Sequence, residues 1–164
     1  VGIMAATLEC AKLALASIPN VEIITLLIAV YSYTFGALGV VGALVFVLIE
    51  PLIWGFGSWF ITYLIYWPLV ALIFSLYGKR KLCGRFITTA TALLTTLFFG
   101  ILSSLVDVGL FMGYFDNFIY RFSVYYMRGI GFYIAQLASN AVLFPLLFKT
   151  LTDILMRIKK KMIK

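Results

Sequence analysis

Several kinds of catalytic chemistry are excluded by residues that the sequence lacks. The 164 residues include no histidine, so neither a histidine-based catalytic triad nor a histidine-ligated metal site can form. No G-x-x-x-x-G-K-[ST] phosphate-binding loop is present. The two cysteines, Cys10 and Cys83, cannot build a metal site alone, and the six acidic residues lack the spacing of a cation-binding loop. We therefore expect no catalysis, metal or cofactor; an intramembrane enzyme that uses the acids is a minor alternative.

The remaining polar side chains could instead hold a small ligand. A pocket with aromatic walls and a few polar groups is the usual composition of a small-molecule site. Gln136 and Asn140 are four residues apart and share a helix face with Tyr133. The candidate ligand-binding residues are Lys12, Asn20, Glu22, Glu50, Trp54, Trp59, Tyr63, Asp107, Arg121, Arg128, Tyr133, Gln136 and Asn140.

The ligand itself is defined only broadly by these residues. Aromatic side chains with mixed charges suit a heterocycle, and Lys12 or Arg128 could hold a carboxylate or a phosphate. Several vitamins satisfy this description, so the substrate is not specified.

Simpler structural interpretations exist for most of these residues. Glu9 and Lys12 could form an ion pair three residues apart that lets the first helix enter a membrane. Arg128 and Asp107 could pair across two helices, and tryptophans often act as membrane anchors. Two other acids, Glu22 and Glu50, could be solvated residues at helix ends.

The composition is that of an integral membrane protein. Hydrophobic residues make up 64% of the chain and charged residues 12%, compared with about 45–50% and about 25% in soluble domains. The net charge of +7 does not indicate nucleic-acid binding, because ten of the thirteen basic residues lie in two blocks, 79–85 and 149–164. Both blocks are typical of cytoplasmic anchors near anionic lipid headgroups. We expect an all-α bundle in the cell membrane, the plasma membrane of a prokaryote.

The basic segment 79–85, KRKLCGR, orients the predicted bundle. A Lys or Arg at the bilayer centre costs roughly 2.5–3.5 kcal/mol, so this segment must be a loop between two apolar runs. The positive-inside rule places it in the cytoplasm. With both termini also cytoplasmic, the acids Glu22, Glu50, Asp107 and Asp116 gather at the outer side.

Six transmembrane helices in a single domain, 1–164, follow from this orientation. The stretch 23–50 is long enough for one span, but one span would place the basic loop outside. We therefore expect it to divide at Phe35–Gly39, although each half is short for a hydrocarbon core of about 30 Å. The predicted helices are 1–18, 21–35, 38–50, 58–78, 86–112 and 123–150, followed by a basic cytoplasmic tail at 153–164.

Small residues recur every four positions in the first predicted helix. Gly2, Ala6, Cys10 and Ala14 would line one face, and such a face lets another helix approach closely. The partner could be another helix of this chain or a different protein.

With these features, the chain resembles a substrate-binding S component of an energy-coupling factor (ECF) vitamin transporter. The resemblance covers nearly the whole chain and rests on its size, six helices and three runs: K-L-A-L-x-x-I-P-N-V-E-I at 12–23, I-W-G-F-G-x-W at 53–59, and G-I-x-F…S-N at 129–140. It implies a ligand site at the outer side near 20–22 and 50–57. It also implies that Ala6, Cys10 and Ala14 dock on a membrane coupling subunit, with Cys replacing one Ala.

The resemblance further implies the mechanism. The bundle would capture a small water-soluble vitamin or related micronutrient outside the cell and reorient while docked to the coupling subunit, driven by two ATPase subunits. Similar sequences often have acidic residues and His where Tyr133 and Gln136 stand here, so no substrate is transferred. The alternatives are a ligand-free membrane assembly protein, the intramembrane enzyme and a stand-alone secondary transporter.

Overall fold

The computed structural model describes residues 1–18, 22–111 and 116–162. These residues form helices and contain no strand. The helices are α1 (Gly2–Leu15), α2 (Ile24–Phe35), α3 (Ala37–Trp54), α4 (Trp59–Lys79), α5 (Arg85–Val106), α6 (Phe118–Leu143) and α7 (Lys149–Met162), and two π-helical segments, η1 (Asp107–Phe111) and η2 (Phe144–Phe148), follow α5 and α6.

Four helical segments in the described part of the chain are long and apolar enough to cross a membrane. They are Ala37–Trp54, Trp59–Lys79, Arg85–Phe111 and Phe118–Lys161. The prediction of an all-α membrane protein is confirmed at this level. Six spans with both termini in the cytoplasm remain a prediction.

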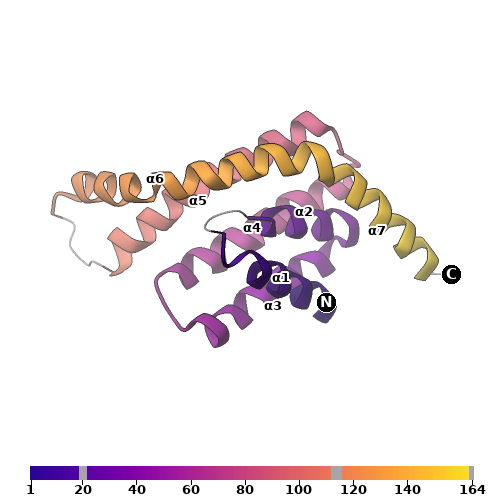
Figure 1. The fold of residues 1–164 in the computed structure, drawn as a ribbon, viewed down its shortest axis with the longest axis horizontal. Coiled ribbons are helices and arrows are strands. Elements are labelled where there is room, and N and C mark those ends of the chain that lie inside the picture. The colour runs from indigo at the N-terminus through magenta and orange to yellow at the C-terminus, as the bar shows by residue number, and fades with distance from the viewer. Residues whose placement is uncertain (19–21, 112–115, 163–164) are drawn as a thin grey trace.

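Helix α2 is the central helix of the fold. Nine of its 12 residues are buried, and it packs against α4, α3, α1 and α7. At 1.5 Å per residue it rises only about 18 Å, less than a hydrocarbon core of about 30 Å. A short helix without a polar face gains stability from tertiary packing, and here its neighbours cover it on most sides (Figure 1).

The predicted division of 23–50 into two helices is confirmed, and the break between them is the single residue Gly36. Gly36 has φ +62° and ψ −124°, a conformation that residues with a Cβ rarely adopt, and it is the only residue between α2 and α3. Gly39 then lies against the backbone of Ser32, where no side chain would fit. The two glycines allow α3 to turn back along α2.

The Gly36 turn, the basic loop and α7 meet at one end of the molecule. Gly78 of α4 lies directly against the carbonyl of Tyr33 near the end of α2. Lys159 of α7 donates a hydrogen bond of 2.7 Å to the carbonyl of Thr34. Because cations favour helix C-termini, this contact stabilises the end of α2. We call this the basic end.

Helix α1 runs in the same direction as α3. Met4 packs on Gly42 near the start of both helices, and Lys12 pairs with Glu50 near the end of both. Helix α1 therefore begins toward the basic end and leads away from it. The start of α2, which runs back, lies at the opposite end.

Helices α5 and α6 pack side by side along their length. The Asn140 amide donates a hydrogen bond of 2.9 Å to Thr96, and Tyr133 lies against Gly100. In Figure 1 the end of α5 and the start of α6 project beyond the other helices. Pro145 falls in η2, where a π-helical turn replaces the hydrogen bonds that proline removes, and the chain bends into α7.

Three predicted boundaries need correction. Helix α1 ends at Leu15 rather than at 18, since the chain tightens into a turn before Pro19. Helix α3 continues through Pro51 to Trp54, because proline removes only one helical hydrogen bond and Gly55, at φ +78°, ends the helix.

The third correction concerns the segment expected to be an outer loop at 113–122. Helix α6 begins at Phe118, five residues before the predicted start at 123. The aromatic rings of Phe118, Phe122 and Tyr126 stack along one face and favour helix in this segment. The basic tail is also helical, as α7.

Candidate functional site

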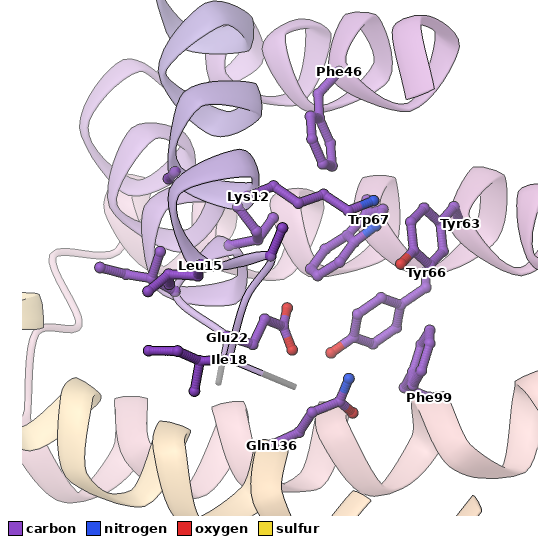
Figure 2. A pocket seen from close by; sticks show the side chains of 14 residues that line it. Lys12, Leu15, Ile18, Glu22, Phe46, Tyr63, Tyr66, Trp67, Phe99 and Gln136 are labelled. Atoms are coloured by element: carbon purple, nitrogen blue, oxygen red, sulfur yellow. The ribbon is translucent and has the colours of Figure 1, made fainter. Parts of the chain in front are cut away.

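A cavity of about 210 Å³ lies where α1 ends and α2 begins. Five aromatic side chains form much of its wall, and three polar side chains, Lys12, Glu22 and Gln136, face it from α1, the α1–α2 connection and α6 (Figure 2). The aromatic residues are Phe46 of α3, Tyr63, Tyr66 and Trp67 of α4, and Phe99 of α5. Six helices and one connection thus converge on one small space, at the end of α2 that lies away from the basic end.

Helix α4 supplies most of the aromatic wall. Its residues Tyr63, Tyr66 and Trp67 occur at i, i+3 and i+4 and so share one helix face. The rings pack edge to face, with 5.7 Å between the centroids of Tyr63 and Trp67 and 4.9 Å between those of Tyr66 and Phe99. These contacts fix the rings, so the wall is formed before any ligand arrives.

Lys12 pairs with Glu50 rather than with Glu9. Glu50 is fully buried on α3, and the Lys12 ammonium reaches it across the space between α1 and α3. The ammonium also lies 5.4, 6.0 and 5.3 Å from the ring centroids of Trp54, Trp59 and Tyr63. The same residues line an open hollow of about 380 Å³, which shares Lys12 and Tyr63 with the cavity. The positive charge of Lys12 is therefore neutralised and enclosed by aromatic faces.

Glu22 has no such counter-charge. The hydroxyl of Thr25 donates a hydrogen bond of 2.8 Å to its carboxylate, and within residues 1–18, 22–111 and 116–162 no cation lies within ion-pair distance of it. Burial raises the pKa of Glu22, while its bonds to Thr25 and the charge of Lys12 lower it by less. The site thus contains one carboxylate that is partly desolvated and lacks a cationic partner.

Seven of the predicted binding residues are brought together around the cavity and the adjoining hollow. They are Lys12, Glu22, Glu50, Trp54, Trp59, Tyr63 and Gln136. Asn20 lies outside the described residues. The alternative that Glu22 and Glu50 are solvated residues at helix ends is wrong for Glu50, which is fully buried. Glu22 does lie near the start of a helix, but it faces the cavity.

The other predicted residues do not line the cavity. Asn140 is buried between α6 and α5, where it bonds Thr96, and Tyr133 fills the space over Gly100. Arg128 is exposed on α6, and it forms no ion pair with Asp107, which lies in η1. The two residues expected to pair across helices therefore form no ion pair, and neither lines the cavity.

Arg121 also lies away from the cavity. It borders a shallow surface depression near the start of α6, together with Tyr120, Val124 and Tyr125.

Sequence reasoning missed much of the aromatic wall. Phe46 and Phe99 are phenylalanines in apolar helices and carry no distinguishing pattern. Tyr66 and Trp67 could have been found, since they continue the face of Tyr63. The apolar residues at the end of α1 were also missed.

The small-residue face of α1 is exposed. Ala6, Cys10 and Ala14 are all accessible, whereas Ala5 and Leu8 on the opposite face are buried against the bundle. Within the described residues, this face is therefore not an internal packing face.

No protein-family model, curated protein or solved structure matches this chain. The functional argument therefore depends on the geometry of the cavity and on the chemistry of its lining.

Proposed function

We propose that the chain is the substrate-binding S component of an ECF-type importer. It captures a small water-soluble vitamin or related micronutrient outside the cell, and a membrane coupling subunit with a pair of ATPase subunits drives uptake. The chain itself supplies affinity and specificity and breaks no bond. It lies in the cell membrane with both termini and the basic end in the cytoplasm.

The observation that carries the proposal is the cavity at the end of α2. It combines five aromatic walls with Glu22 and Gln136, and it lies away from the basic end. If the basic end is cytoplasmic, the cavity faces the outer half of the membrane, where a scavenging receptor meets its ligand. A site built on six helices is also well suited to high affinity, since little ordering is needed on binding.

The exposed face of α1 gives independent support. In water, exposed alanines have little significance, but in a membrane a small-residue face lets a partner helix approach closely. The resemblance described above assigns this face to the coupling subunit. Ala6, Cys10 and Ala14 are free to make that contact, because α1 packs inward through Ala5 and Leu8.

The proposal is tested by what the protein carries when it is purified. The full chain is isolated from membranes in nanodiscs, released compounds are identified by mass spectrometry, and uptake of the compound is measured in cells with and without the coupling module. We expect one small heterocyclic compound and ATP-dependent uptake. A protein that retains and binds nothing in a broad metabolite screen would favour the ligand-free assembly protein instead.

A further inference from the structure

The cavity by itself suits a small ligand, and it adjoins the open hollow of about 380 Å³ at Lys12 and Tyr63. The cavity's volume of about 210 Å³ is below the roughly 300–1,000 Å³ of sites for drug-sized molecules. One aromatic ring, or two fused rings, with small substituents fills such a space.

The wall favours a flat ligand. Tyr66 and Phe99 lie at the same side of the cavity with their rings held by mutual contact, and Trp67 is 4% exposed. Planar rings bury their faces well against aromatic side chains. An aromatic wall also attracts positive charge through the electrons of its ring faces.

The charges around the cavity select the sign of the ligand. The ammonium of Lys12 is already paired with Glu50 and covered by the rings of Trp54, Trp59 and Tyr63, so it has little attraction left for an anion. Glu22 keeps an unpaired carboxylate that faces the cavity. An anionic ligand would meet that carboxylate without compensation, whereas a cationic ligand would neutralise it.

Two neutral polar groups complete this edge of the cavity. Figure 2 shows the Glu22 carboxylate, the Tyr66 hydroxyl and the Gln136 amide pointing toward a common space. The Gln136 side-chain oxygen is buried and has no hydrogen-bond partner among the described residues. In Figure 2 the Gln136 amide nitrogen, rather than this oxygen, points toward Glu22 and Tyr66. The Glu22 carboxylate is therefore the acceptor at this edge, and it calls for N–H donors from a ligand.

We infer that this cavity binds a flat, nitrogen-containing aromatic cation whose N–H groups face Glu22. The inference rests on the proposed function and names the substrate class of that site. It replaces the sequence-based expectation that Lys12 or Arg128 holds a carboxylate or phosphate, because Lys12 is paired and Arg128 lies outside the cavity.

The test uses three probes of the same shape and different charge. Benzamidinium, benzamide and benzoate are titrated into the full chain in nanodiscs, with binding measured by calorimetry and by the shift in thermal unfolding. We expect benzamidinium to bind, benzamide to bind at least about tenfold more weakly, and benzoate not to bind. Tenfold corresponds to about 1.4 kcal/mol. Equal binding of the three, a preference for benzoate, or no binding of benzamidinium would overturn the inference.

A pair of variants locates the charge. Glu22→Gln keeps the shape of the side chain and should lower benzamidinium affinity at least about tenfold while lowering benzamide affinity much less. Asp107→Asn removes a carboxylate that does not line the cavity and should change neither. Equal loss in both variants would mean that general charge rather than Glu22 attracts the cation. The proposed function is judged separately by ATP-dependent uptake, so a failure of the charge assignment is distinguishable from a failure of the function.

Discussion

The Lys12–Glu50 ion pair neutralises the charge of Lys12 beside the cavity and also stabilises the fold. Glu50 is fully buried, while the Lys12 side chain is 28% exposed. A buried ion pair is worth little relative to apolar residues, but removal of one partner leaves a buried charge alone. The two residues join α1 to α3, so their loss affects the placement of α1.

We therefore predict that Lys12→Met lowers the free energy of unfolding by about 3 kcal/mol, near the low end of values for breaking buried pairs because Lys12 retains some solvent access. At 2–4 °C per kcal/mol this is roughly 6–12 °C in the unfolding temperature, measured in detergent micelles. Lys149→Met, an exposed lysine on α7, is the control and should change little. The double variant Lys12→Met with Glu50→Gln should recover much of the loss; a double variant as unstable as the single would show that the pair is not responsible.

Glu22 gives ligand binding a pH dependence. Its pKa is raised above the ordinary value of 4.5 by burial, so it becomes anionic at a higher pH than a solvated glutamate. The charged and titratable groups that face it are Lys12, which is paired with Glu50, and the phenols of Tyr63 and Tyr66, which ordinarily titrate far above this range.

The affinity for benzamidinium should therefore rise as pH increases through the raised pKa of Glu22. The ligand-free protein should show the opposite trend: a raised folded-state pKa contributes stability below 4.5 that is lost as pH increases through the folded-state value. Calorimetry and thermal unfolding across this range measure both. Glu22→Gln should flatten the affinity curve and reduce the slope of the stability curve, and an unchanged affinity curve in that variant would assign the titration to another group.

At the scale of helices, glycines on neighbouring helices determine how closely those helices approach α2. Gly78 on α4 lies directly against the carbonyl of Tyr33, and any Cβ there would collide with backbone. Gly84, in the basic loop, has open space around it. The fold around the cavity depends on this approach, because α4 carries most of the aromatic wall.

Gly78→Ala should accordingly destabilise the protein by about 1–3 kcal/mol, the usual range for inserting a methyl group into a packed contact. Gly84→Ala, with nothing near its Cβ, should have little effect. Thermal unfolding of the two variants beside the parent protein measures the difference. Similar stability in both would mean that the ends of α2 and α4 can separate at little cost.

The sequence was sufficient to predict the helices but not all of the site. Apolar periodicity and the basic loop predict α2, α3 and α4, and the glycine at 36 marks the division between α2 and α3. Lys12, Glu22 and Gln136 were predicted because charged and amide side chains are conspicuous among apolar residues. Phe46 and Phe99 were not, because a phenylalanine in an apolar helix has the same sequence pattern whether it faces lipid or a cavity.

The misassigned residues share a different cause. Asp107 and Arg128 are as conspicuous as Glu22, but they lie on the projecting ends of α5 and α6. Helix lengths can be predicted from the sequence, but they do not show how far the α5–α6 pair is shifted along its axis relative to the other helices. Charge alone therefore predicts participation only for residues on the part of a helix that borders the cavity.

At the scale of the whole molecule, the orientation in the membrane determines which side the cavity faces. The basic loop, the Gly36 turn and α7 lie together, and the cavity lies at the other end of α2. Arg80 in the basic loop and Phe56 in the α3–α4 connection are both exposed and lie at opposite ends of α4.

Single cysteines at these two positions, in a chain with Cys10→Ser and Cys83→Ser, should differ in labelling of intact cells. A membrane-impermeant maleimide should label Phe56→Cys from outside and Arg80→Cys only after the cells are opened. Labelling of Arg80→Cys from outside would reverse the orientation and place the cavity toward the cytoplasm, where the proposed capture of an external ligand is impossible.

The two faces of α1 separate ligand binding from transport. Lys12 and Ala11 line the cavity, whereas Ala6 and Ala14 are exposed on the outer surface of the bundle. A leucine in place of either alanine would hold a partner helix away without reaching the cavity. Binding and coupled uptake should therefore respond differently to the same substitution.

We predict that Ala6→Leu or Ala14→Leu abolishes ATP-dependent uptake while ligand affinity changes less than about twofold. Ala138→Leu, the same change at an exposed alanine of α6, is the matched control and should leave both unchanged. Uptake is measured in cells that contain the coupling module, and affinity by calorimetry on the purified chain. Loss of binding together with uptake would indicate that the α1 face supports the fold rather than a partner, and normal uptake in both α1 variants would place the coupling contact on another surface.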